Sequence, residues 1–341
     1  GLRLVQLHKY LSNQNTKAMK TEAKRSVSET PIRKGQEAYS SKAVISRQAK
    51  GSSDIYQKFT DLIIEKLEQG VIPWKQPWHE MGLPSNYLTK KPYKGINLWL
   101  LLSCGHQYPY YLTFKQANSL GGKIKKGAKA LPICYWNFVF RDKMTGKTIP
   151  ESKLDFYDLK QVGRSGFLRE FKVFPIEQIE GIDWEFPEAS PNTQIPVNGA
   201  CQKIYAEMVR PPELIHQGSM AYYRTDLDQI TMPERKLFPS SEAYFGVLYH
   251  ELCHATGHSS RLNRTEITKP HSFYDSGYAR EELLAEMGAG YLNNYTGILD
   301  QSLLENSAAY IQSWLKELRN DKHLLIDAAS KAQKAVDYIL N

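Results

Sequence analysis

Two histidines spaced four residues apart, with a glutamate directly after the first, are the residues of this chain that most clearly indicate chemistry. His250-Glu251-Leu252-Cys253-His254 reads H-E-x-x-H and lies in a stretch, 240–257, whose pattern predicts a helix. The spacing places both imidazoles on one helical face, one turn apart. Two nitrogens so placed can bind one Zn²⁺ ion at about 2.0–2.1 Å each. Glu251 can then act as general base toward a water molecule at the metal.

A catalytic zinc site needs a third protein ligand and an open fourth position. The metzincin pattern would place a histidine at position 260, but the chain has Ser260 there. Glu282 and Glu286 share a face of a later predicted helix, so one can bind the metal while the other orients a histidine. We predict Glu282 as the ligand, with Glu286 and His258 beside the site as orienting or substrate-contacting groups. The alternative is an acidic helix start, which the helix dipole also favours.

Length and composition indicate two domains, or one domain with large appendages, and no membrane span. The chain has 341 residues, 41% of them hydrophobic, and a mean hydropathy of −0.50. No apolar run is long enough to cross a bilayer. The apolar stretch at residues 4–7 is too short for the hydrophobic core of a signal peptide. Its four cysteines include no C-x-x-C pair, which is typical of reduced thiols. We therefore predict a cytoplasmic protein.

The positive charge is concentrated in the first part of the chain. Residues 1–50 hold eleven Lys and Arg against three Glu, a net charge of +8. Residues 54–140 carry +6, whereas residues 141–341 carry −6. This asymmetry predicts nucleic-acid binding by the first part. It also argues against a nuclease at the histidines, because a polyanion would be repelled from the acidic part.

Aromatic and lysine residues alternate between positions 71 and 136. Exposed aromatic rings can stack on bases, and lysines can neutralise phosphates, which together suit a single strand bound without sequence preference. The alternative is that most of the rings belong to a core and the lysines to an ordinary solvated face. We predict that single-stranded DNA is contacted by Trp74, Lys75, Trp78, Lys90, Lys91, Tyr93, Lys94, Lys115, Lys123, Lys125, Lys126 and Lys129.

Helical and strand patterns are mixed along the chain, which indicates an α+β fold. Predicted helices cover about 54–69, 97–103, 113–120, 201–209, 240–257, 278–293, 308–318 and 325–340. Predicted strands cover 131–141 and 171–174, with a hairpin over 221–232. The predicted domain organisation is a basic flexible tail (1–50), a basic single-stranded-DNA-binding domain (51–185), a proline-containing linker (186–198) and a second domain (199–341).

The order of these motifs resembles the ArdC antirestriction proteins over about residues 54–341. The first part matches through Ile72-Pro73-Trp74-Lys75-Gln76-Pro77-Trp78, Tyr93-Lys94-Gly95-Ile96-Asn97, Tyr111-Leu112-Thr113-Phe114-Lys115-Gln116-Ala117 and Lys125-Lys126-Gly127. The second part resembles that family's zincin-like metallopeptidase domain through His250 to His258, Arg261-Leu262-Asn263-Arg264 and Tyr278 to Glu286. The first part is also similar to a region of TraC-type conjugative primases, although no primase catalytic segment is evident.

The resemblance implies a plasmid- or mobile-element-encoded protein that binds single-stranded DNA and shields incoming DNA from restriction. Metallopeptidases with E-x-x-A-x-x-x-A take their third ligand from its glutamate, and Glu282, Ala285 and Ala289 fit that pattern. The resemblance thus implies one Zn²⁺ per chain, held by His250, His254 and Glu282. It also implies a restriction protein or another host protein as substrate. Two alternatives stay open: a non-catalytic DNA-shielding protein with structural zinc, and a protease switched on by DNA.

Overall fold

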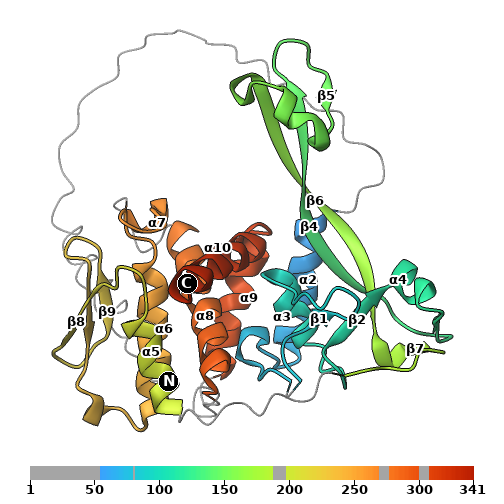
Figure 1. Ribbon diagram of the computed structural model, residues 1–341. Coiled ribbons are helices and arrows are strands. Elements are labelled where there is room, and N and C mark those ends of the chain that lie inside the picture. The colour runs from blue at the N-terminus through green and yellow to red at the C-terminus, as the bar shows by residue number, and fades with distance from the viewer. Residues whose placement is uncertain (1–53, 80, 187–196, 269–275, 299–306) are drawn as a thin grey trace, which may run out of the picture.

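The computed structural model describes residues 54–79, 81–186, 197–268, 276–298 and 307–341 (Figure 1). The predicted tail (1–50) and residues 187–196 of the predicted linker lie outside the described residues. Helices and strands are mixed, as the α+β prediction requires. Among the described residues, no helix has both the length and the apolarity needed to cross a bilayer.

The first helix, α2 (Ile55–Glu68), begins where the sequence predicts. The Asp54 side chain accepts a hydrogen bond from the backbone N–H of Tyr56 at 3.1 Å, which satisfies a helix N-terminal donor. Its buried face carries Phe59, Ile63 and Leu67 at helical spacing. The following elements up to residue 124 are η1 (Pro73–Lys75), β1 (Ser85–Asn86), α3 (Ile96–Leu102), β2 (Tyr110–Thr113), α4 (Phe114–Ser119) and β3 (Lys123–Ile124).

A five-stranded sheet follows, with strand order β1-β2-β6-β4-β5. Strand β4 (Leu131–Asp142) pairs antiparallel with β6 (Val162–Pro175) along its whole length, while β6 meets β2 only at its last three residues. The paired strands therefore leave the sheet as a long two-stranded ribbon, which rises beyond the helices in Figure 1. The predicted strand 131–141 is confirmed, whereas β6 begins nine residues before the predicted 171.

The ribbon and its surroundings include several short elements. These are β5 (Thr148–Ile149), η2 (Glu151–Phe156), η3 (Leu159–Gln161), η4 (Ile176–Gln178) and β7 (Ile179–Glu180), the last of which pairs with β3. Residues 150–161, between β5 and β6, thus form the far end of the ribbon.

The second part consists of a small sheet and a group of helices. Its sheet has the order β8-β10-β9, from β8 (Glu213–His216), β9 (Tyr222–Arg224) and β10 (Gln229–Met232). The predicted hairpin is β9–β10, and the parallel partner β8 was not predicted. The remaining elements are α5 (Val197–Ala206), η5 (Arg235–Leu237), α6 (Ser241–Ala255), α7 (Thr265–Thr268), α8 (Ser276–Thr296), α9 (Ser307–Asn320) and α10 (Leu324–Ile339).

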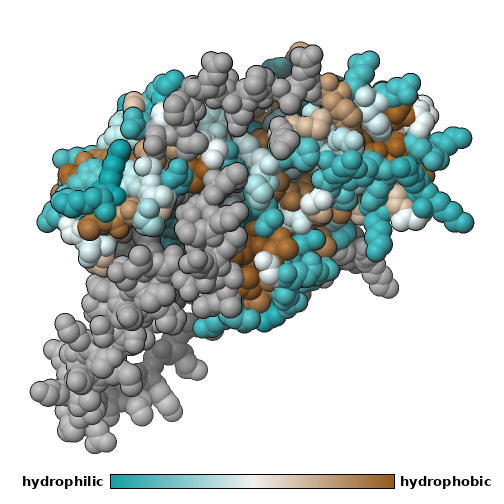
Figure 2. Space-filling model, turned by 90° about the horizontal axis from the view of Figure 1, so that it is seen from below, coloured by the Kyte–Doolittle hydropathy of each residue, from teal (hydrophilic) through white to brown (hydrophobic). Residues whose placement is uncertain are grey.

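The two parts share one hydrophobic core. The largest cluster of buried residues includes Phe59, Ile63 and Leu98 of the first part together with Leu248 and Val336 of the second. In Figure 1, α2 and α3 lie beside α9 and α10. The two predicted domains, 51–185 and 199–341, therefore pack against each other through a common core. Polar side chains cover much of the described surface seen in Figure 2, with small hydrophobic groups between them.

Helix α8 approaches its neighbours closely because two of its residues lack a side chain. A Cβ at Gly288 would lie 2.4 Å from Cys253 Sγ on α6. A Cβ at Gly290 would lie 2.1 Å from the backbone oxygen of Trp74 in η1. Asn294, one turn further on, accepts a hydrogen bond from the Trp78 N–H at 2.9 Å. The segment around η1 is thus fixed to the helix that carries the predicted third metal ligand.

Gly290→Ala should lower the free energy of unfolding by about 3 kcal/mol, because the new methyl group would overlap backbone that cannot move away. Gly246→Ala on α6 is the matched control, since its Cβ would meet Asn293 at an ordinary 3.6 Å. This control should gain about 0.5–1 kcal/mol from helix propensity. Urea titrations of both variants measure the difference; equal stabilities would contradict the close contact.

His106 forms an ion pair that ties the loop before β2 to η4. Its Nδ1 lies 2.8 Å from Glu177 Oε1, and both side chains are mostly buried. Hydrogen bonds to Cys104 and Glu177 raise the pKa of His106 to about 9, while burial opposes the shift. Burial would raise the pKa of Glu177, but the hydrogen bond from His106 lowers it overall. The ring of Tyr111 also faces the imidazole, edge-on at 5.9 Å.

The pair should make stability depend on pH in the alkaline range. Because the pKa of His106 is raised on folding, its contribution is complete below about pH 6.5 and is lost as pH rises through about 9. We expect the wild type to lose about 1–2 kcal/mol more than His106→Gln between these values. Denaturant titrations at both pH values test this; parallel pH profiles for the two proteins would refute it.

Candidate metal centre

The two histidines of the H-E-x-x-H motif lie on α6 as their spacing predicts. Ser240 caps the helix by accepting a hydrogen bond from the Ala243 N–H at 3.1 Å. The second half of α6 is buried on all sides, so His250 and His254 are both buried, each 8% exposed. Their Nε2 atoms face each other at 3.0 Å. Glu251, 1% exposed, follows His250 on the same buried part of the helix.

Helix α8 brings a carboxylate to these two nitrogens. Glu282 Oε2 lies 3.6 Å from His250 Nε2, and Glu282 Oε1 lies 3.4 Å from His254 Nε2. Among the described residues these three form the group of side chains whose donor atoms could hold a metal, all within 4.8 Å of one another. Burial would raise the pKa of Glu282, but hydrogen bonds with His250 and His254 hold it well below its usual range. The third donor is therefore anionic.

A buried carboxylate next to Glu282 holds the second histidine in place. Glu281 Oε1 lies 3.2 Å from His254 Nδ1, the ring nitrogen that faces away from the donor group. A carboxylate on that nitrogen fixes the orientation and tautomer of a ligating imidazole. Burial would lower the pKa of His254, but hydrogen bonds with Glu281 and Glu282 raise it to about 9.

Arg264 holds Glu281 from the other side. Its Nε donates to Glu281 Oε2 at 3.0 Å and its Nη2 donates to Glu281 Oε1 at 2.5 Å, a bidentate pair. The same guanidinium donates to the Cys253 backbone oxygen at 2.8 Å and to Thr256 Oγ1 at 2.6 Å. The loop after α6, the end of α6 and the start of α8 thus meet at one buried cation. Sequence reasoning missed this role, although Arg264 and Glu281 both lie inside the motifs that carry the family resemblance.

Of the two remaining predicted residues of this site, Glu286 contacts the donor group and His258 contacts other residues. Glu286 Oε1 is 3.7 Å from His250 Nδ1, which is consistent with an orienting role. His258 lies in the turn after α6, where its Nδ1 is 2.8 Å from Ser260 Oγ and 3.8 Å from Asp228 Oδ2. It therefore faces the β9–β10 hairpin. The Glu282 side chain is 25% exposed, so the donor group is open to solvent on one side.

The predicted DNA-binding residues divide by exposure. Trp74 and Tyr93 are buried, so neither ring is available to stack on a base, and this part of the prediction is corrected. Trp78 is half-buried with its ring edge-on to Tyr291 of α8 at 4.9 Å, and Lys75 is half-buried in η1. The exposed members are Lys90, Lys91, Lys94, Lys115, Lys123, Lys125, Lys126 and Lys129. Rings that pack against α8 and in the cores look the same in sequence as rings on a surface.

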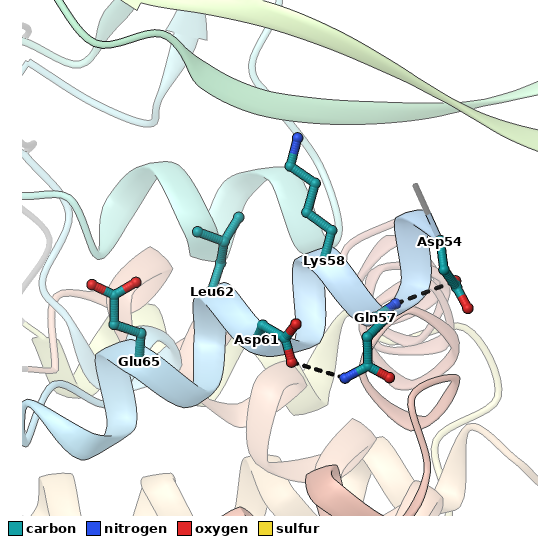
Figure 3. A pocket seen from close by; sticks show the side chains of 6 residues that line it. All are labelled: Asp54, Gln57, Lys58, Asp61, Leu62 and Glu65. Atoms are coloured by element: carbon teal, nitrogen blue, oxygen red, sulfur yellow. Dashed lines mark hydrogen bonds between the residues drawn. The ribbon is translucent and has the colours of Figure 1, made fainter. Parts of the chain in front are cut away.

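A pocket elsewhere on the molecule lies along α2 (Figure 3). It is lined by Asp54, Gln57, Lys58, Asp61, Leu62 and Glu65. Figure 3 shows Lys58 pointing toward the strands above, where its Nζ lies 2.5 Å from Glu170 Oε1 of β6. The pocket is one face of a single helix, and its lysine is already paired. Among the described residues, the side chains that could hold a metal are those of the histidine and glutamate group and not those of this pocket.

Two parts of the chain match two families of known proteins. Residues 53–174 match the family described as the N-terminal domain of anti-restriction factor ArdC, and residues 207–331 match a zincin-like metallopeptidase family. The metal-free crystal structure of antirestriction ArdC protein from plasmid R388 has 32% identity and a TM-score of 0.62, covering 84% of this chain and 97% of that one. Its Mn(II)-bound structure has 31% identity and a TM-score of 0.63.

Curated relatives include longer proteins. A DNA primase TraC from Escherichia coli is 35% identical over 294 residues, which are 84% of this chain and 20% of that protein. The uncharacterized protein y4eC from Sinorhizobium fredii is 31% identical over 299 residues, 84% of this chain and 92% of that protein. The chain thus spans about a fifth of that TraC primase.

The fold and the site define a zincin-like metallopeptidase domain joined to an ArdC-type N-terminal domain. The chain belongs to the ArdC family of antirestriction proteins.

Removing Arg264 should destabilise the protein strongly, because Glu281 would remain buried without its bidentate partner. We expect Arg264→Met to lower the free energy of unfolding by about 3 kcal/mol. Arg319→Met is the control: its pair with Glu68 on α2 is about half exposed, and exposed pairs contribute about 0–1 kcal/mol. Chemical denaturation of both variants tests the ranking, and an Arg319 effect as large as that of Arg264 would contradict it.

Proposed function

We propose that this chain is an antirestriction protein that binds single-stranded DNA and carries a zinc-dependent peptidase centre, with one Zn²⁺ per chain. The observation that supports it is the meeting of His250, His254 and Glu282 beside Glu251. Imidazole and carboxylate donors suit zinc, and a His₂Glu set with one solvent-facing side is typical of catalytic rather than structural zinc. The related ArdC protein of plasmid R388 has been crystallised with Mn(II).

The donor set fits a divalent cation on the chemistry of its residues. Two ring nitrogens that face each other at 3.0 Å, with a carboxylate kept anionic beside them, bring three donor atoms to one point. The outward nitrogen of His254 is held by Glu281, so that ring needs little reorganisation when a metal binds. When bound, the metal supplies a Lewis acid that polarises a substrate carbonyl and lowers the pKa of water to about 7.

Each residue of the site then has its own role in the proposed reaction. Glu251 accepts the proton of the attacking water and passes it to the leaving amine, as general base and then general acid. His250, His254 and Glu282 hold their positions on two packed helices, so their donor atoms stay converged during the reaction. Glu286 orients His250, and His258 contacts the substrate side. A host protein, such as a restriction enzyme, is the proposed substrate class.

DNA binding is proposed for the N-terminal part, away from the metal centre. Residues 54–140 carry a net charge of +6, and most of their predicted contact lysines are exposed. Residues 123–129, which comprise β3 and most of the loop before β4, hold four of these lysines within seven positions. The net charge of −6 over residues 141–341 would keep a polyanion from the peptidase centre, which favours a protein over DNA as the molecule cleaved.

The test is a comparison of wild type with Glu251→Gln, with His250→Ala as the metal-loss control. Each protein is purified for metal analysis and incubated with a quenched fluorescent peptide library. Glu251→Gln should keep one zinc per chain and its affinity for single-stranded DNA, while losing about 10²–10⁴-fold in peptide hydrolysis. His250→Ala should lose the metal.

An antirestriction assay on the same variants separates the two activities. Unmodified plasmid DNA is transferred into a restricting host that expresses each protein. If peptide hydrolysis drives protection, Glu251→Gln loses it. Full protection by Glu251→Gln, together with wild type that cleaves no peptide, would favour the non-catalytic DNA-shielding alternative. Undiminished zinc in His250→Ala would rule out the metal assignment.

A further inference from the structure

The ribbon of β4 and β6 exposes aromatic side chains on both of its faces. Directly paired residues share a face, and the pairs Trp136↔Leu168 and Asn137↔Phe167 therefore point to opposite sides. Trp136 is 45% exposed and Phe167 is 47% exposed. The core clusters of the described residues take in β4 only up to Cys134 and β6 only from Leu168 onward. The outer ribbon, residues 135–141 and 163–169, thus contributes little to the hydrophobic core of the protein.

The rings on one face lie over a glycine. A Cβ at Gly166 would lie 3.1 Å from Phe138 Cε1 and 3.3 Å from Trp136 Cε3, so both rings lie over that position of β6. The Arg164 guanidinium lies 3.6 Å above the Phe138 ring. On the opposite face, the Tyr135 and Phe171 rings meet edge-on at 5.9 Å. Each face combines flat apolar surface with a nearby cation.

Charge in this region has one sign. Residues 135–141 and 163–169 contain three arginines, at 141, 164 and 169, and no Asp or Glu. The carboxylates at the two ends of these stretches are engaged: Glu170 pairs with Lys58, and Asp142 accepts hydrogen bonds from the Met144 and Thr145 N–H groups. Exposed rings with arginines and without carboxylates are the features that bind unpaired bases and phosphates.

We propose that the outer ribbon, residues 135–141 and 163–169, is an element around which single-stranded DNA binds, with Trp136 stacking on bases at one face, Phe167 stacking on bases at the other face and Arg164 contacting phosphate. The proposal rests on the DNA-binding function proposed above and assigns that binding to a different element from the lysines of residues 54–129. A second copy of the ribbon is a poor occupant, because it would bring three arginines against three arginines. A duplex would hide the base faces that these rings can stack on.

The experiment measures the affinity of the full chain for a fluorescein-labelled mixed-sequence oligodeoxynucleotide, single-stranded and annealed to its complement. Trp136→Ala and Phe167→Ala should each weaken single-strand binding by about 5- to 150-fold. Trp136→Phe keeps an aromatic ring and should retain most of the affinity. Tyr295→Ala, which removes an exposed ring from α8, is the matched control and should bind like wild type.

The salt dependence provides a second readout that a folding defect would not mimic. Arg164→Gln should reduce the slope of log affinity against log salt by about 0.7, the value for one phosphate contact on a single strand. Circular dichroism and thermal melting show that the variants are folded.

The outcomes separate this proposal from the general function. Wild-type binding that Trp136→Ala, Phe167→Ala and Arg164→Gln all leave unchanged overturns the ribbon assignment and leaves DNA binding intact. A wild type with no affinity for the single strand overturns the DNA-binding function itself. Equal affinity for duplex, lost in the same variants, overturns the single-strand assignment. A wild-type dimer that Trp136→Ala dissociates, seen by light scattering, makes the ribbon a self-association surface instead.

Discussion

The close packing of α8 against its neighbours is the constraint on which the rest of this structure depends. Gly288 lets α8 approach Cys253 on α6, and Gly290 lets it approach the backbone at Trp74. This approach brings the start of α8 to the histidine face of α6, so the donors of Glu282 come within 3.4–3.6 Å of the imidazole nitrogens. Side chains at these positions would separate the helices, because a protein interior has little free volume to absorb them. The metal centre is thus a consequence of helix packing.

The packing of α8 also joins the ArdC-type part and the zincin-like part of the chain. The segment around η1, which the sequence suggests as part of a DNA surface, is held to α8 through Trp78 and Asn294. Its Trp74 ring lies in the core that the ArdC-type part and the zincin-like part share. The first part is therefore continuous, through the shared core, with the helix that carries Glu282.

The buried ion network around His254 shows how the site tolerates its charges. Glu281 and Glu282 are adjacent in sequence but contact different groups. Glu282 faces the Nε2 atoms of the two histidines, whereas Glu281 contacts His254 Nδ1 and Arg264. Two carboxylates beside two imidazoles would be costly in a low-dielectric interior without a compensating cation. Arg264 supplies that charge and also binds the backbone at the end of α6. The loop after α6 is therefore part of the site, although it contributes no donor atom.

The sequence by itself determined the local features: the H-E-x-x-H helix, most other helices and the strand at 131–141. These features follow from the spacing of residue types along the sequence, because the period of a helix or strand determines which nearby residues share a face. Tertiary structure decided which aromatic rings are buried, since Trp74 and Trp136 differ only in what packs on them. It also decided the length of β6 and the roles of Arg264 and Glu281. Those depend on contacts between distant segments, where one residue's neighbours, not its type, set its function.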